Sequence, residues 1–276
     1  MLHEAAPAKL NLDLLVTGRR ANGYHLLDSL VTFVDGHDRL TFTHDAALRL
    51  EVTGPMAGAL PEGEENIVLK AARRLAEVAG VEPRAAITLD KRLPVAAGIG
   101  GGSADAAAAL RGLCRLWEVR LPNARLAELA LELGADVPVC LQGRPARLRG
   151  VGERLEPLAD LPALDLALVN PRVPLATAAV FRALDLARCG PRTAGLTWRR
   201  SRNDLEAPAR RLLPVIGEVL EALRATPGCA LARMSGSGPT CFGLFADAEA
   251  AHAAAEALQR AHPNWWIVAC RSVAAP

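Results

Sequence analysis

Lysine is scarce in this chain of 276 residues. It occurs only at Lys9, Lys70 and Lys91, and every other basic residue except histidine is an arginine. Since the chain uses arginine wherever a positive charge is enough, each lysine is a candidate for a specific role. The formal net charge is +2, and no run of five like charges occurs. The concentrated basic face of a nucleic-acid-binding protein is therefore not expected.

Several signatures of other protein classes are missing as well. No window reaches the roughly 18 consecutive apolar residues of a membrane-spanning helix. The first seven residues lack the basic and apolar segments of a signal peptide. The six cysteines include no C-x-x-C pair, and the six histidines form no H-E-x-x-H motif. We therefore expect a cytoplasmic protein with reduced, mostly buried thiols, no structural metal and no membrane partner.

The hydrophobic pattern predicts a folded protein of mixed secondary structure, since 51% of the residues are hydrophobic. Strands are expected over residues 8–16, 24–34, 39–42, 48–52, 85–89, 164–169, 230–234, 241–245 and 266–270. Helices are expected over residues 66–78, 104–117, 126–133, 177–186, 212–225 and 248–261. Because strands and helices do not alternate strictly, this order favours an α+β fold in two domains over a doubly wound sheet.

Three stretches add detail to this pattern. Residues 8–16 alternate apolar and polar side chains, which predicts a half-buried strand. Residues 151–153 and 157–162 are expected to connect the two halves. Residues 187–203 are polar and are expected to be irregular.

The strongest functional signal is a glycine-rich segment at residues 94–104. It reads Pro94-Val95-Ala96-Ala97-Gly98-Ile99-Gly100-Gly101-Gly102-Ser103-Ala104 and leads into a helical pattern. Ser103 is expected to cap that helix, and Asp105 to lie in its first turn. The N–H groups at the beginning of such a helix bind phosphates. A flexible loop before a capped helix is the alternative.

Two other phosphate-binding loops do not fit this segment. A Walker A loop needs a lysine after its second glycine, and the segment contains none. The dinucleotide-binding pattern G-x-G-x-x-G can begin at Gly98, but Ser103 then stands in place of its third glycine.

Three segments resemble the three motifs of the GHMP kinase superfamily, in the same order along the chain. The glycine-rich segment resembles the second motif, Pro7-Ala8-Lys9-Leu10-Asn11-Leu12 resembles the first, and Met234-Ser235-Gly236-Ser237-Gly238-Pro239-Thr240-Cys241-Phe242 resembles the third. Residues 23–25, 134–138 and 203–206 resemble the branch that phosphorylates the 2-hydroxyl of 4-diphosphocytidyl-2-C-methyl-D-erythritol in the non-mevalonate isoprenoid pathway. Three positions depart from the usual motifs: Ala97 replaces a glycine, Ala104 a serine and Pro239 an alanine.

The resemblance implies a fold and a nucleotide. The N-terminal half (residues 1–155) is expected to resemble ribosomal S5 domain 2, and the C-terminal half (residues 156–276) to be ferredoxin-like, with the active site in the cleft between them. The nucleotide is expected to be ATP with Mg²⁺, and the phosphates are expected to hold the metal. The implied ATP-binding residues are Asn66, Pro94, Val95, Ala96, Ala97, Gly98, Ile99, Gly100, Gly101, Gly102, Ser103 and Ala104.

The resemblance also implies the catalytic residues. Asp136 is expected to accept the hydroxyl proton, while Lys9 orients Asp136 and stabilises the developing negative charge. The residues alone leave alternatives open. An aspartate shortly before Pro138 is also a natural helix start, and Lys9 on a strand can simply be solvated.

A cytosine ring requires flat apolar faces and hydrogen bonds at its edge. The resemblance implies that Tyr24 and Phe181 enclose the ring and that His25 contacts its edge. Core packing is the alternative for Phe181, and a solvated surface position is the alternative for His25. The remaining implied substrate-binding residues are Asn11, Thr177, Gly236, Ser237 and Gly238. A plain hairpin turn is the alternative for residues 236–238.

Three other functions stay open at this stage. The first is a related kinase acting on homoserine, mevalonate or a sugar, but none of these substrates has a base that could stack on Tyr24 and Phe181. A nucleotide-binding protein without catalysis would not need both Lys9 and Asp136. A dinucleotide-dependent oxidoreductase is disfavoured by the missing third glycine.

Overall fold

The computed structural model describes residues 1–60, 65–158, 160–193 and 197–273. The chain forms two compact units. The first comprises Met1–Ala8, His37–Val95 and Gly100–Gly143, and the second comprises Lys9–Gly36, Ala96–Ile99 and Arg144–Pro276. Strands β1 (Leu2–Asn11) and β3 (His25–Thr43) each contribute residues to both units. The boundary expected between residues 155 and 156 concerns the domains of the family, and it stays a prediction.

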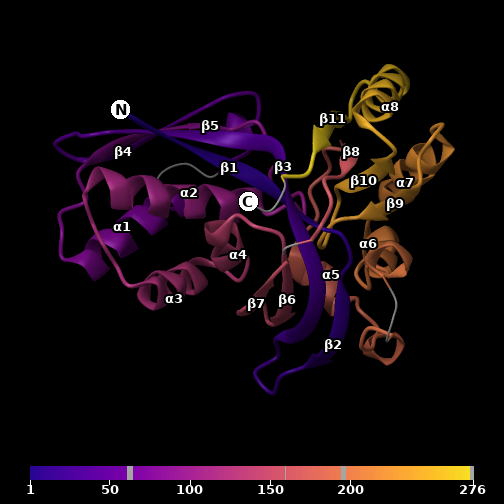
Figure 1. Cartoon of the computed structure of the whole chain (residues 1–276), viewed down its shortest axis with the longest axis horizontal. Coiled ribbons are helices and arrows are strands. Elements are labelled where there is room, and N and C mark those ends of the chain that lie inside the picture. Colours follow the sequence, from indigo (N-terminus) through magenta and orange to yellow (C-terminus); the bar gives the residue numbers. More distant parts are fainter. Residues whose placement is uncertain (61–64, 159, 194–196, 274–276) are drawn as a thin grey trace. The chain divides into compact units, whose positions relative to one another are not determined.

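The first unit packs helices against a short sheet (Figure 1). Strand β4 (Leu48–Thr53) pairs in parallel with β5 (Ala85–Asp90), and β5 pairs antiparallel with residues 39–43 of β3. The helices of this unit are α1 (Ile67–Ala79), α2 (Gly101–Leu116), α3 (Asn123–Leu133), α4 (Val137–Gln142) and a 3-10 turn at Ala57–Ala59. Helix α2 contacts α1, α3 and α4, so it is the centre of the helical layer.

Small residues let α2 approach its neighbours closely. Its alanines at positions 104 and 106–109 are all buried. A Cβ atom at Gly112 would lie only 2.2 Å from Cε2 of Phe42 on β3, so the aromatic ring occupies the space that a side chain would need. The core of the first unit therefore depends on glycine at this helical position.

A buried ion network joins β3, the residues after β5 and α2. Lys91 is 1% exposed, and its Nζ donates to Oδ2 of Asp38 at 2.5 Å and to Oδ2 of Asp105 at 2.6 Å. The other oxygen of Asp38 accepts the backbone N–H groups of Arg92 and Leu93. Burial lowers the pKa of Lys91, but the two carboxylates outweigh it and the net pKa is raised.

One ammonium does not fully compensate two buried carboxylates. Burial raises the pKa of Asp105 to about 7, with the Asp38 carboxylate adding to the rise and Lys91 opposing it. Within the described residues, Oδ1 of Asp105 is buried and has no hydrogen-bond partner. Ionised Asp105 is therefore a cost to the folded state near neutral pH.

The second unit contains a four-stranded antiparallel sheet in the order β11 (Trp266–Arg271), β8 (Asp165–Asn170), β10 (Cys241–Phe245) and β9 (Leu231–Met234). Helix α8 (Ala248–Ala261) connects β10 to β11. Along the chain, β8 is followed by helices α5 (Thr177–Arg182), α6 (Glu206–Leu212) and α7 (Val215–Ala225), and then by β9. The succession strand, helix, strand, strand, helix, strand with this sheet order is ferredoxin-like. The predicted α+β fold is confirmed.

One face of this sheet carries the core of the unit. Val169 of β8 packs in a cluster with Ile216 and Leu220 of α7, and Ala167 of the same strand packs with Ala251 and other residues of α8. Residues two apart on a strand point to the same side. Helices α7 and α8 therefore cover the same face of the sheet (Figure 1).

Further strands complete the second unit. Residues 25–31 of β3 pair with β2 (Leu15–Arg19) and with β6 (Ala146–Gly150), and β6 pairs with β7 (Arg154–Pro157). Two 3-10 turns, Leu186–Arg188 and Trp198–Arg200, lie in the segment expected to be irregular. None of the six cysteines, all of which are described, forms a disulfide, and three of them are buried. Among the described helices, none has the length and apolar character needed to span a bilayer.

Several expected elements need correction. The strand expected at residues 8–16 is two strands, β1 and β2, and all nine residues are buried rather than alternately exposed. The helix expected at residues 212–225 begins at Val215, as α7, because Pro214 lacks the N–H group that would continue a helix from the preceding turn. Helix α6, which ends at Leu212, was not expected. The helix expected at residues 177–186 ends at Arg182.

Other elements were missed by the sequence pattern. Strands β6 and β7 were not expected, and helix α4 was anticipated only as a possible helix start at Asp136. Residues 151–153 form the turn between these two strands instead of a connection between halves. Short elements carry too few residues for a periodic pattern. Residue 159 of the expected connection and residues 194–196 of the expected irregular segment lie outside the described residues.

The raised pKa of Asp105 predicts a specific pH dependence of stability. Its ordinary value is 3.8 and its folded value is about 7, so the folded state binds the proton more tightly and the wild-type chain loses stability as pH rises between these values. Asp105→Asn removes this loss while it keeps an oxygen for Lys91. We expect the Tm of the variant, relative to wild type, to be higher at pH 8 than at pH 5. A Tm difference that is constant or smaller at pH 8 would show that Asp105 is ionised at little cost.

Candidate active site

The glycine-rich segment leads directly into helix α2. The helix begins at Gly101, after Gly100 in a left-handed conformation with φ 64°, and no side chain caps it. The expectation that Ser103 caps the helix is wrong, because glycine adopts the left-handed conformation readily and the helix starts earlier. Asp105 lies beyond the first turn and pairs with Lys91 instead. The N–H groups at this helix start remain available to an anion such as a phosphate.

Residues 96–99 belong to the second unit and contact the third motif there. A Cβ atom at Gly98, whose φ is 72°, would lie 2.6 Å from the carbonyl oxygen of Ser235 and 2.7 Å from the nitrogen of Gly238. A Cβ atom at Gly236 would lie 2.6 Å from the carbonyl oxygen of Gly98. The two segments thus meet backbone to backbone, at a distance that only glycine permits.

Hydrogen bonds join the same two segments and add the first motif. Thr240 donates its N–H to the carbonyl of Ala97 at 3.1 Å, and Lys9 donates its N–H to the carbonyl of Ile99 at 2.9 Å. Ala97 does not adopt a positive φ, so a side chain is tolerated at this departure from the family motif. All three motif segments are therefore in contact within the second unit.

Ser235 is the side chain at the centre of these contacts. Its hydroxyl donates to the carbonyl of Gly98 at 3.0 Å and accepts the N–H of Asn11 at 3.0 Å. Next along the loop, the hydroxyls of Ser237 and Thr177 lie 2.8 Å apart. Residues 236–238 do join two antiparallel strands, as the hairpin alternative expects, and they also form part of the candidate site.

Lys9 is buried, not solvated. It is 3% exposed, and its Nζ donates to Oδ1 of Asn11 at 2.7 Å. Nδ2 of Asn11 donates in turn to Oγ of Ser29 at 2.8 Å. The solvated alternative for Lys9 is therefore wrong, because the side chain is held inside the second unit by a polar partner.

Asp136 lies in the first unit, at the residue before helix α4. Pro138 is the second residue of that helix. The sequence pattern thus located a helix start correctly, but the Asp136 side chain makes no capping hydrogen bond. Capping is therefore no explanation for an aspartate at this position.

The expected aromatic residues have different environments in the second unit. Tyr24 follows the turn after β2 and is 64% exposed. His25 stacks on Phe181, with ring centroids 4.9 Å apart and planes at 27°. Phe181 is partly buried and also packs against the hydrophobic core next to α7, so the core-packing alternative applies as well. Burial and the charge of Arg19 lower the pKa of His25, which keeps its imidazole neutral at pH 7.

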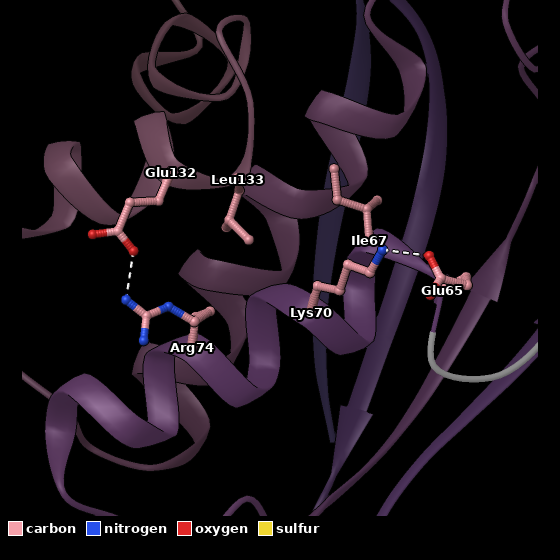
Figure 2. Close-up of a pocket in the computed structure, with 6 residues that line it drawn as sticks. All are labelled: Glu65, Ile67, Lys70, Arg74, Glu132 and Leu133. Carbon is pink, nitrogen blue, oxygen red and sulfur yellow. Dashed lines mark hydrogen bonds and ion pairs between the residues drawn. The ribbon is translucent and has the colours of Figure 1, made fainter.

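Asn66 caps helix α1, and its Oδ1 accepts the N–H of Val68 at 3.0 Å. The two residues that flank Asn66 in the chain, Glu65 and Ile67, line a hollow of about 590 Å³ between α1 and α3 (Figure 2). It is lined by Glu65, Ile67, Lys70, Arg74, Glu132 and Leu133. Its charged side chains form the ion pairs Lys70–Glu65 and Arg74–Glu132, and no expected site residue lines it.

Residues outside the expected set hold these segments in place. Asn203 donates from Nδ2 to the carbonyls of Met234 and Gly236, both at 2.8 Å. Arg233 is buried, and its guanidinium donates to the carbonyls of Leu12, Trp198, Arg199 and Ser201. Only Asn203 carried a signal in the sequence, as part of a resembling segment. The acceptors of Arg233 are backbone carbonyls distant in the chain, which no local pattern reveals.

Within the described ranges, no group of three or more histidine, cysteine, aspartate or glutamate residues is arranged to hold a metal ion. A metal that arrives bound to a nucleotide needs no such group, because the phosphates and water supply most of its ligands.

Comparison with known proteins agrees with the three motifs. Residues 66–144 match the GHMP kinases N terminal domain, and residues 192–264 match the GHMP kinases C terminal domain. A protein of Paramagnetospirillum magneticum named 4-diphosphocytidyl-2-C-methyl-D-erythritol kinase is 58% identical over 272 residues, which cover 95% of each chain. A protein of the same name from Rhodospirillum rubrum is 53% identical over 98% of this chain and 92% of its own length.

A solved structure gives the same result. The crystal structure of a 4-(cytidine 5'-diphospho)-2C-methyl-D-erythritol kinase is 39% identical, with a TM-score of 0.84 over 99% of this chain and 100% of that chain. By sequence identity, coverage and fold, this chain belongs to the 4-diphosphocytidyl-2-C-methyl-D-erythritol kinase family of the GHMP kinases.

Proposed function

We propose that the chain transfers the γ-phosphoryl group of ATP to the 2-hydroxyl of 4-diphosphocytidyl-2-C-methyl-D-erythritol, a step in the synthesis of isoprenoid precursors. The observation that carries the proposal is the contact among the three motif segments in the second unit, in a chain 58% and 53% identical to proteins named for this activity. Six cysteines without a disulfide also suit a cytoplasmic location.

In this proposal, Asp136 removes the proton from the 2-hydroxyl. The oxygen then bonds to the γ-phosphorus, and the bond from that phosphorus to the bridging oxygen breaks, which leaves ADP. Lys9 stabilises the negative charge that develops on the oxygens. Its burial supports this role, because a cation acts more strongly where water is excluded.

The glycine-rich segment is the proposed phosphate site. Gly101 and Gly102 begin α2 without side chains between its N–H groups and a bound phosphate. The proposed ATP-binding residues remain Asn66 and residues 94–104. Mg²⁺ bound with the nucleotide would neutralise phosphate charge. The residues at the start of α2 would contact this complex of Mg²⁺ with the nucleotide phosphates.

The exposed ring of Tyr24 and the ring of Phe181 are the proposed stacking surfaces for cytosine. In the structure His25 covers one face of Phe181, so a base can stack on that face only after His25 moves away. Because its imidazole is neutral, His25 can then donate or accept a hydrogen bond at the base edge. Thr177 and Ser237 supply hydroxyl groups and Gly236 an N–H group for the rest of the substrate. Gly238, whose N–H is donated to the carbonyl of Ser235, completes this loop, and Asn11 on β1 contacts the same loop through Ser235.

The proposed substrate can be tested by measuring ADP release with Mg-ATP. We expect turnover with 4-diphosphocytidyl-2-C-methyl-D-erythritol and none with mevalonate, homoserine or galactose, because only the first has a base that Tyr24 and Phe181 can stack on. Turnover with another member of this panel would keep the kinase activity but overturn the roles of Tyr24, His25 and Phe181.

Asp136→Asn tests the proposed base. The variant keeps the size of the side chain and loses no cap, so we expect an unchanged circular dichroism spectrum and a kcat at least ~10²-fold lower. Asp247→Asn is the matched control, because Asp247 caps α8 and asparagine caps equally well. Near-normal turnover in folded Asp136→Asn would remove Asp136 as the base.

Tyr24→Ala tests the stacking role. Stacking is equally strong in the ground state and the transition state, so its loss is expected to raise KM for the cytidine substrate about tenfold and to leave kcat and the KM for ATP unchanged. The exposure of Tyr24 means that its removal opens no cavity. Tyr24→Phe keeps the ring and is expected to resemble wild type. A lower kcat at unchanged KM in Tyr24→Ala would contradict this role.

A further inference from the structure

The hydroxyl of Ser29 is hydrogen-bonded to the side-chain amide of Asn11, and the other end of that amide contacts Lys9. Ser29 is the fifth residue of β3 and is fully buried. Its Oγ donates to the carbonyl oxygen of Asp13 at 2.5 Å and accepts from Nδ2 of Asn11 at 2.8 Å. Three side chains and one carbonyl thus form a continuous chain of hydrogen bonds that ends at Nζ of Lys9.

This chain can run in only one direction. The carbonyl of Asp13 can only accept, so Ser29 directs its single hydrogen there and can only accept from Asn11. Asn11 must therefore turn its NH₂ group toward Ser29 and its Oδ1 toward Lys9. Lys9, as an ammonium, can only donate, so this is the amide orientation that it requires. The opposite orientation would place two donor groups against each other.

The far end of the chain is itself held in place. The Asp13 side chain is fully buried, and its carboxylate accepts the N–H of Leu30 at 2.9 Å and a hydrogen bond from Nη2 of Arg192 at 2.9 Å. The backbone N–H of Asn11 is held by Ser235. Ser29 is therefore the one adjustable group between a fixed carbonyl and the amide of Asn11.

We propose that Ser29 is a positioning residue for phosphoryl transfer, which fixes Nζ of Lys9 by anchoring the far end of the Asn11 amide. The inference rests on the proposed function, in which Lys9 stabilises the transferring charge. It also changes the role of Asn11, because both ends of its side chain are engaged inside the protein and it acts on Lys9.

Ser29→Ala is the first test. It leaves Nδ2 of Asn11 without its acceptor, so the amide is anchored at one end only and can shift together with Lys9. A displacement of about 1 Å costs up to ~100-fold in rate, so we expect kcat to fall about 10- to 100-fold while the KM for ATP stays within about twofold. Thr32→Val is the matched control. Thr32 is also fully buried on β3, and its hydroxyl has no hydrogen-bond partner among the described residues, so its kcat is expected to be unchanged.

A double-mutant cycle separates positioning from general stability. If Ser29 acts through Asn11, then Ser29→Ala lowers kcat in the wild-type background but has no further effect in Asn11→Ala. Equal effects of Ser29→Ala in both backgrounds would overturn the proposal, as would an unchanged kcat in folded Ser29→Ala.

The scarcity of lysine allows a measurement that does not depend on activity. In protein labelled with ¹³C at the lysine Cε atoms, Lys9, Lys70 and Lys91 give three NMR signals. We expect Ser29→Ala to shift the Lys9 signal alone, and Thr32→Val to shift none. An unmoved Lys9 signal would overturn the positioning role. If Ser29→Ala shifts the Lys9 signal but the wild-type chain phosphorylates no substrate, then Ser29 does position Lys9 and the proposed function is rejected instead.

Discussion

The second unit depends on the close backbone approach of residues 96–99 to the loop between β9 and β10. Gly98 and Gly236 lie where a Cβ atom would come within about 2.6 Å of a backbone oxygen, so two side chains are excluded at once. Hydrogen bonds from Thr240 and Ser235 then fix the register of the two segments. Since Lys9 and Asn11 are bonded to the same segments, their positions follow from this approach.

Two of the three lysines in this protein are buried, one in each unit. Lys9 and Lys91 are both nearly inaccessible to solvent. Lys91 lies between two carboxylates and joins three parts of the first unit, so its ion pairs are explained by architecture. Lys9 donates to the neutral amide of Asn11, and the proposed function assigns its charge to the transferring phosphoryl group.

The substrate side of the candidate site combines a rigid and a movable part. Thr177 and Ser237 are bonded to each other, and Asn203 holds the backbone of the same loop. Tyr24, in contrast, extends into solvent, and His25 stacks on Phe181, where the proposed function places the base. Binding of a cytidine group would therefore exchange one ring contact for another, which keeps the cost of opening this part of the site small.

Much of this protein could be inferred from its sequence alone. The glycine spacing of residues 98–102, the order of the three motif segments and the α+β succession were local signals, and the fold class and the family agree with them. Tertiary structure decided the rest. Helix α2 begins at Gly101 instead of residue 104, because Gly100 adopts a left-handed conformation. Lys9 is buried instead of solvated, in a strand whose backbone contacts the distant residue Ile99. Ser29 gave no signal at all, since its significance lies in a carbonyl 16 residues away and in the direction of a hydrogen bond. Local spacing encodes backbone conformation, whereas the orientation of a buried polar side chain is set by partners that only folding brings together.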